Sequence, residues 1–277
     1  MGRAFRADGS RVVRLADFPP DDTGGVNKTK ARELTNELGQ ELSELADLLY
    51  YAREHALLIV LQGRDTSGKD GTIRSILNYT NAQSVRVESF KEPTPEELSH
   101  DFLWRIHRRV PGRGYATLFN RSHYEDVLVA RVHRLVPEPV WRRRYDHINR
   151  FEELLLDSKT LILKFFLHIS PEEQEKRLLA RERETEKAWK LSVGDWKERE
   201  LWDDYTAAYE DALNYCGTSG APWYVVRADH KWYRDLQVIE QIVETLRPYR
   251  EEWLASLAET GRTGRRELEE YRSRTRR

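Results

Sequence analysis

Cysteine and long apolar runs are both scarce in this sequence. The single cysteine, Cys216, excludes an internal disulfide and a metal cluster built from cysteines. The longest apolar run falls far short of the ~18 residues that span a membrane, and the first residues, "MGRAFRADGS", lack the apolar centre of a secretory signal. We therefore expect a cytoplasmic protein that has no membrane partner.

Net charge is also nearly absent, although charged residues are common. The chain holds 46 Lys and Arg residues against 47 Asp and Glu residues, which gives a net charge of -1. Such a balance provides no general attraction for nucleic acid or for anionic lipid. We expect no nucleic-acid partner, and a site for an anionic ligand must come from a local group of basic residues.

The 277 residues divide into three parts. Residues 1–28 contain "DFPPDDTGGVN" and predict an irregular arm that lies on the surface or is partly disordered. Residues 29–250 are expected to form one domain. Residues 251–277 end in a stretch that is nearly all charged, which predicts a solvated helix or tail. Partner binding is the minor alternative.

The pattern of the middle part is typical of an α/β fold. Leucines that recur every three or four residues predict an amphipathic helix over residues 30–53. Five short apolar or β-branched runs follow, at residues 56–62, 84–90, 115–120, 160–169 and 223–228. Charged helical stretches separate most of them. We predict a three-layer sandwich in which helices cover both faces of a five-stranded parallel sheet.

The first strand leads into a pattern for binding phosphate. Gly63, Gly68 and Lys69 satisfy G-x-x-x-x-G-K, and the following "KDGTIRSIL" has the apolar spacing of a helix. Backbone N–H groups in such a P-loop bind an anion together with the helix dipole, and the lysine reaches the phosphate that is transferred. A glycine-rich turn without a ligand is the alternative.

Two residues depart from the usual loop. Asp70 replaces the Ser or Thr that normally binds magnesium, and Thr72 is a substitute candidate. Asp65 lies inside the loop, where phosphates would repel a carboxylate unless a divalent cation lay between them. We therefore predict Asp65 as a magnesium ligand, with a turn-capping Asp as the alternative.

A second polar group follows the third strand, in "NRSHYED". Ligands collect at the carboxyl ends of parallel strands, so Asn120, Arg121 and Glu125 should face the same crevice as the loop. A basic residue at a helix start is unfavourable for the dipole, so Arg121 indicates an anionic partner. A solvated acidic patch is the alternative for Glu125 and Asp126.

Basic residues also recur in "PEEQEKRLLARERETEKAWK". Arg177 and Arg181 share one helical face and predict a lid over residues 171–200 that closes over phosphate. An exposed helix with internal salt bridges is the alternative, because glutamates alternate with these residues.

Several motifs in order resemble the polyphosphate kinase 2 family. They are "LQGRDTSGKDGTI", "SFKEPTPEEL", "FNRSHYEDVLVARVH", "ILKFFLHIS", "LWDDYTAAYEDAL" and "DHKWYRDL", and the resemblance covers residues 29–247. It implies a P-loop kinase fold like that of thymidylate kinase, and magnesium-dependent transfer of the terminal phosphate between inorganic polyphosphate and a nucleotide. Manganese is an alternative metal. Homo-oligomers are usual in the family, which implies a homodimer or homotetramer.

The resemblance also implies roles for residues of this chain. The catalytic residues would be Asp65, Lys69, Arg121 and Glu125, with Asp65 as a metal ligand. This chain departs from the other branches, with Asn120 in place of an Asp and Glu125 in place of an Asn, so we assign the second metal position to Glu125. The phosphate and polyphosphate ligands would be Gly63, Gly68, Lys69, Lys91, Arg131, Arg177 and Arg181. The nucleotide would contact Asp65, Thr66, Ser67, Asn120 and Arg121. For Lys91 a salt bridge with a neighbouring Glu is an equal alternative.

The second motif distinguishes branches of that family. Other branches resemble "DRSWYN", whereas "NRSHYED" is similar to the branch that accepts both AMP and ADP. Adenine nucleotides are therefore the expected partners, with guanine as an alternative base. We expect the loop to hold the acceptor nucleotide and polyphosphate to arrive from the lid. The rival interpretations are an NTP-dependent nucleoside monophosphate kinase and a non-catalytic P-loop binding protein.

Overall fold

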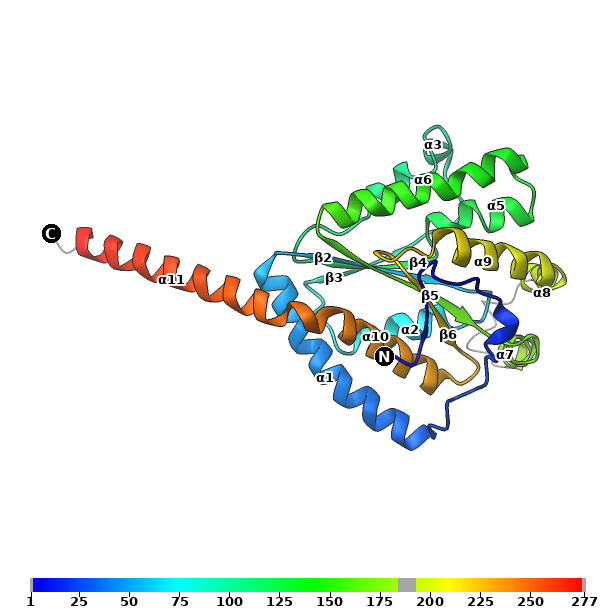
Figure 1. The fold of residues 1–277 in the computed structure, drawn as a ribbon, viewed down its shortest axis with the longest axis horizontal. Coiled ribbons are helices and arrows are strands. Elements are labelled where there is room, and N and C mark those ends of the chain that lie inside the picture. The colour runs from blue at the N-terminus through cyan, green and yellow to red at the C-terminus, as the bar shows by residue number, and fades with distance from the viewer. Residues whose placement is uncertain (1, 184–192, 276–277) are drawn as a thin grey trace.

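The computed structural model describes residues 2–183 and 193–275 (Figure 1). Residues 184–192 of the predicted lid lie outside the described part, as do residue 1 of the arm and residues 276–277 of the tail. Within the described ranges, no helix is long and apolar enough to cross a bilayer.

A six-stranded sheet forms the middle layer, in the order β1-β6-β5-β2-β4-β3. The strands are β1 (Phe5–Ala7), β2 (Ala56–Gln62), β3 (Val85–Ser89), β4 (Ala116–Asn120), β5 (Thr160–His168) and β6 (Trp223–Arg227). Strands β2 to β6 run parallel, which confirms the five predicted strands. The prediction of a purely parallel five-stranded sheet is wrong at one edge, where β1 pairs with β6 in antiparallel orientation.

The extra strand also corrects the predicted arm. Instead of being irregular throughout, residues 1–28 supply β1 and bury Val13, Leu15 and Phe18 in the core. The rings of Phe5 and Phe18 stack with their centroids 4.4 Å apart. A strand of three residues is too short to show an alternating pattern, and the Pro, Gly and Asp cluster behind it dominates the sequence signal.

Helices cover both faces of the sheet (Figure 1). One face is covered by α6 (Glu138–Asp157) and α9 (Trp202–Cys216), and the other by α1 (Lys28–Ala52), α2 (Lys69–Leu77) and α10 (Lys231–Leu246). Each face has its own core, with Ile148 and Tyr209 in the first and Leu45 and Ile239 in the second. The predicted three-layer sandwich is therefore confirmed.

Shorter elements and two peripheral helices complete the fold. The short helices are η1 (Leu15–Asp17), α3 (Pro95–Leu98), α4 (Trp104–His107), η2 (His123–Asp126), α5 (Val129–Val132) and η4 (Arg247–Tyr249). The region predicted as a lid contains α7 (Pro171–Arg183) and α8 (Val193–Glu200). The last helix, α11 (Arg250–Thr275), projects away from the sandwich (Figure 1).

Candidate active site

The P-loop connects the end of the central strand β2 to the start of α2. All of β2 is buried, and α2 begins at Lys69 directly after Gly68. Gly63 and Gly68 have φ angles of 152° and 105°, which lie in the region that favours glycine. A Cβ at Gly68 would collide with the guanidinium of Arg234. Both glycines are thus required by the backbone path of the loop.

Lys69 is buried beneath this loop. Its Nζ donates to the carbonyl oxygens of Gly63 at 2.7 Å and Arg64 at 3.2 Å. Burial lowers the pKa of Lys69, and the nearby Asp65 carboxylate opposes that shift. The two carbonyls hold the ammonium group at the centre of the loop, where an incoming phosphate would be a stronger partner than either carbonyl.

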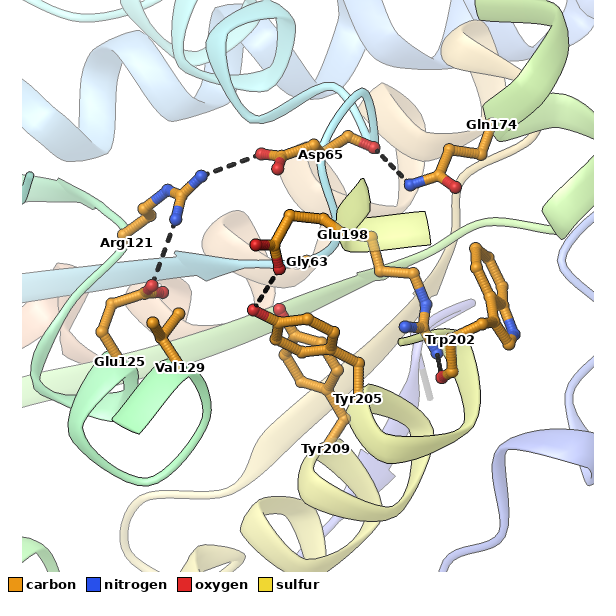
Figure 2. Close-up of a pocket in the computed structure, with 11 residues that line it drawn as sticks. Gly63, Asp65, Arg121, Glu125, Val129, Gln174, Glu198, Trp202, Tyr205 and Tyr209 are labelled. Atoms are coloured by element: carbon orange, nitrogen blue, oxygen red, sulfur yellow. Dashed lines mark hydrogen bonds and ion pairs between the residues drawn. The ribbon is translucent and has the colours of Figure 1, made fainter. Parts of the chain in front are cut away.

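Arg121 connects the loop to the second polar group (Figure 2). Its Nη2 donates to Oδ1 of Asp65 at 2.8 Å, and its Nη1 donates to Oε2 of Glu125 at 3.2 Å. Burial lowers the pKa of Arg121, but the two carboxylates outweigh it and the net shift is upward. The structure therefore brings together the four residues predicted to be catalytic, because Lys69 lies within the same loop as Asp65.

Asn120 and Asp70 form a further link between the two segments. The side-chain Nδ2 of Asn120, at the end of β4, donates to Oδ1 of Asp70 at 2.9 Å. The aspartate that replaces the usual hydroxyl thus connects the first turn of α2 to the neighbouring strand. Asp126 is directed elsewhere, since Nη1 of Arg144 donates to its Oδ1 at 3.0 Å. Burial raises the pKa of Asp126 to about 6.

The predicted lid residue Arg177 serves the loop in an unexpected way. It donates from Nη1 to the carbonyls of Thr66 at 2.9 Å and Ser67 at 3.1 Å. From Nη2 it donates to the carbonyls of Ala228 at 2.7 Å and Asp229 at 2.8 Å, and from Nε to Glu173 at 2.8 Å. These contacts use all five N–H groups of the guanidinium. In this structure Arg177 fastens α7 to the P-loop and to the end of β6.

The other predicted phosphate ligands are Arg131, Arg181 and Lys91. Arg131 donates to Asp211 at 2.6 Å and lies over the ring of Trp141. Arg181 donates to Asp195 of α8 at 3.0 Å. Lys91 is exposed on the segment after β3, and its carbonyl accepts from Arg105 at 2.9 Å. Arg131 and Arg181 are thus paired with carboxylates of α9 and α8.

Sequence reasoning missed an aromatic wall beside the loop. Trp202, Tyr205 and Tyr209 of α9 line the same small pocket as Gly63, Asp65, Arg121 and Glu125 (Figure 2). The guanidinium of Arg64 lies 3.7 Å from the centroid of the Trp202 ring. The motif "LWDDYTAAYEDAL" carried these aromatic residues. Their spacing of three to four along a helix signals one shared face, but it does not reveal which strand end that face approaches.

A second and wider cavity is lined by Arg177 and shares no lining residue with the small pocket. It has a volume of about 740 Å³ and lies between α1, α2, α7 and the start of α10. Basic side chains from three helices line it, namely Lys28, Arg32, Lys176, Arg177 and Lys231. Glu173, Asp229 and Asp235 are the acidic lining residues among those described. Basic groups therefore outnumber acidic ones in this groove.

A buried polar network supports the second polar group from below. Nζ of Lys164 donates to Glu152 at 2.5 Å and to the hydroxyl of Tyr124 at 2.9 Å, and that hydroxyl donates to Glu152 at 2.8 Å. Nε2 of His123 lies 3.3 Å from the same carboxylate, and burial lowers the pKa of His123. The network fixes His123 and Tyr124, which lie between Arg121 and Glu125 in the chain.

The fold and this site define a P-loop kinase, in which a lysine-bearing loop and an arginine meet at the carboxyl edge of a parallel sheet. The sequence model of the family described as polyphosphate kinase 2 matches residues 25–252. The chain belongs to the polyphosphate kinase 2 family.

Individual relatives cover most of the chain. An AMP/ADP-polyphosphate phosphotransferase from Meiothermus ruber is 48% identical over 246 residues, which is 88% of this chain and 92% of that protein. An ADP-polyphosphate phosphotransferase from Rhodopseudomonas palustris is 41% identical over 98% of this chain and 96% of that protein. The crystal structure of polyphosphate kinase 2 from Arthrobacter aurescens TC1 is 39% identical, with a TM-score of 0.82 over 89% of this chain and 92% of that chain.

Proposed function

We propose that this protein transfers the terminal phosphate of inorganic polyphosphate to AMP and to ADP, with magnesium as the metal. The observation that carries the proposal is the meeting of Lys69, Arg121 and two carboxylates at the P-loop, in a chain that belongs to the polyphosphate kinase 2 family. The names of the relatives from M. ruber and R. palustris support polyphosphate as one substrate and AMP and ADP as the others.

Several features of the loop suit a bound phosphate. The side-chain oxygens of Thr66 and Ser67 are buried, and neither has a hydrogen-bond partner within the described residues. Buried hydroxyls are normally satisfied, so a ligand oxygen is a reasonable partner for each. Together with the N–H groups of the loop and Lys69, they would hold the phosphate of the acceptor nucleotide.

The carboxylates of the site suit a magnesium ion that is shared with substrate. No group of three or more potential metal ligands occurs among the described residues. Magnesium, however, is commonly held by one or two carboxylates together with phosphate oxygens and water. Asp65 and Glu125 are the candidates, since both approach the same guanidinium. Magnesium would supply charge neutralisation between the phosphates, and manganese could replace it.

The reaction needs little covalent help from the protein. The acceptor is a phosphate oxygen that is already anionic, so no general base has to remove a proton. Phosphoryl transfer passes through a loose transition state that depends on alignment and on charge neutralisation. Lys69 and Arg121 would supply fixed positive charge at the transferred group, and Asn120 would keep the two segments in register through Asp70.

Polyphosphate requires a longer basic surface than the loop. We infer that the polyphosphate molecule approaches through the groove between α1, α7 and α10, because Lys28, Arg32 and Lys176 line this groove. Arg177 lines this groove but donates its Nη1 hydrogens to carbonyl oxygens of the P-loop, so it is not counted as a polyphosphate ligand here. The acceptor would lie on the Arg121 side and the donor on the α7 side.

One assay separates this function from its rivals. Purified protein is incubated with magnesium, long-chain polyphosphate and either AMP or ADP, and the formation of ADP and ATP is followed. Product is expected with polyphosphate as the only donor. Product that requires an added nucleoside triphosphate would instead identify an NTP-dependent kinase. Binding of polyphosphate or nucleotide without any product would identify a non-catalytic P-loop protein.

A further inference from the structure

The last helix, α11, packs against the rest of the protein near its start. Near its start, Trp253 is fully buried and its Nε1 donates to Nδ1 of His55 at 3.1 Å, while Ser256 donates to Glu54 at 2.9 Å. Beyond these contacts α11 extends away from the sandwich (Figure 1). Every residue from 264 to 274 is exposed. The match to the family model ends at residue 252, close to the start of this helix.

One face of α11 carries a regular seam. Its members recur at alternating steps of three and four residues, the spacing of helices that pair along their length. They are Leu254, Leu257, Gly261, Gly264, Leu268 and Tyr271. Of the larger side chains, Leu254, Leu268 and Tyr271 are 41%, 46% and 66% exposed. A seam of this length on a projecting helix indicates a partner helix.

The two glycines in the middle of the seam are an independent sign of close packing. Glycine inside an exposed helix destabilises it by about 1 kcal/mol relative to alanine. A Cβ at Gly261 or Gly264 would meet nothing within 4 Å, so the fold of one chain does not require either glycine. A second helix that crosses at this point would require both, because small residues allow two backbones to approach closely.

We propose that α11 pairs with α11 of a second copy of this chain in antiparallel orientation. The seam is symmetric about its centre, so Leu254 then lies opposite Tyr271 of the partner, and Leu257 opposite Leu268. Gly261 lies opposite Gly264 at the crossing. Large side chains thus fill the two ends of the seam and small ones the middle.

Charge selects the antiparallel orientation. The first turn of α11 carries Glu251 and Glu252, and the last turn carries Arg272 and Arg274. Antiparallel pairing brings the acidic end of each helix onto the basic end of the other, with Glu251 beside Arg272 of the second copy. Parallel pairing would place like charges side by side at both ends. Opposed helix dipoles favour the same orientation.

The pairing is tested by sedimentation velocity on the full chain over roughly 1 to 100 µM protein, since assembly depends on concentration. We expect a dimer, or an even-numbered assembly that contains it. Leu268→Lys should raise the dissociation constant of this contact at least about tenfold. Ser273→Lys adds the same charge on the opposite face of the helix and should leave it unchanged. A monomeric parent protein, or equal behaviour of the two variants, would overturn the proposal.

Cysteine pairs test the orientation. Cys216 is buried, so an engineered cysteine would be the accessible thiol of the described chain. Leu254→Cys and Tyr271→Cys chains, mixed under oxidising conditions, should form a disulfide between unlike chains at least several-fold faster than either forms one with itself. Preferential bonds between like chains would show a parallel seam and refute the antiparallel arrangement. Neither result depends on kinase activity, so a failure of the proposed function would be seen separately.

Discussion

At the scale of single residues, Lys69 is the group on which the proposed reaction depends most directly. Lys69→Met keeps the length and packing of the side chain but removes the charge that neutralises the transferred phosphate. We expect kcat for transfer from polyphosphate to ADP to fall by about 10²- to 10⁴-fold. The melting temperature should stay close to that of the parent protein. The variant removes a charged ammonium group, and burial disfavours the charged form of Lys69.

Steady-state kinetics and thermal unfolding check this prediction side by side. The matched control is Lys30→Met, which changes an exposed lysine on α1 that contacts Glu33. That variant should retain the parent rate. Near-normal turnover in Lys69→Met would contradict the role given to the P-loop lysine.

The buried carboxyl of Asp126 predicts how stability responds to pH. Burial raises its pKa to about 6 from an ordinary value of 3.8, so the folded chain keeps a proton that the unfolded chain loses at lower pH. The contribution of this group is fully present below about pH 4 and is lost as the pH rises through 6. Relative to Asp126→Asn, the free energy of unfolding of the parent should fall by up to about 3 kcal/mol between pH 4 and 7.

Urea denaturation of both proteins at several pH values measures this difference. The exposed Asp157→Asn provides the control, whose profile should follow that of the parent. A constant difference between parent and Asp126→Asn across the range would refute the raised pKa.

Which single residues could be foreseen depended on whether their partners lie close in the sequence. The P-loop glycines and Lys69 follow from local backbone requirements, which a short motif records fully. Arg177 and Arg131 could not be assigned in the same way, because their contacts lie far along the chain. Ser67 is 110 residues from Arg177, and Asp211 is 80 residues from Arg131. A basic pattern shows the charge but not which carbonyl or carboxylate satisfies it.

At the scale of elements, α7 is joined to the P-loop mainly by the guanidinium of Arg177, and Nε2 of Gln174 adds one hydrogen bond to the carbonyl oxygen of Asp65 at 3.2 Å. Arg177→Lys keeps a positive charge but cannot reproduce five directed N–H bonds to Glu173 and four backbone carbonyls. We expect a loss of roughly 2–4 kcal/mol in unfolding free energy, since buried acceptors lose their partners. The Michaelis constant for the nucleotide should rise as well. The P-loop would lose the hydrogen bonds from Arg177 to its carbonyl oxygens, which fix the shape of the loop.

The adjacent Lys176 offers a matched stability control. Its side chain is 78% exposed and contacts Glu173. Lys176→Ala should change the unfolding free energy by less than about 0.5 kcal/mol. If Arg177→Lys were as stable as that control, the anchoring role would be wrong and Arg177 would become available as a phosphate ligand.

Elements themselves were predictable where their hydrophobic pattern was long. The five parallel strands and α1 were found within about two residues, because repeated burial on one or both faces leaves a periodic signal. The meeting of Trp202 and Tyr205 with the P-loop was not foreseen. It depends on how α9 packs across the sheet, and the amphipathic pattern of a helix fixes its buried face but not its neighbour.

At the scale of the whole molecule, the N-terminal arm closes the sheet at its β6 edge. β1 pairs with β6 through Phe5 and Val225, and the chain then continues along α9, where Asn214 accepts from the N–H of Val13 at 2.7 Å. Leu15 is 3% exposed and belongs to the main core. A covered edge strand also has fewer free N–H and C=O groups for pairing with other chains. The arm should therefore contribute to stability and to resistance against aggregation.

Leu15→Ala tests this contribution without altering the active site. Removing a buried leucine side chain and leaving a cavity should lower the unfolding free energy by about 2–4 kcal/mol, measured by urea denaturation. Val12→Ala is the control from the same arm, because Val12 is 75% exposed and its loss should cost less than about 0.5 kcal/mol. An arm that merely rests on the surface would give equal, small losses for both variants. Unequal losses of the expected size would establish that the arm adds buried side chains to the core that α6 and α9 cover.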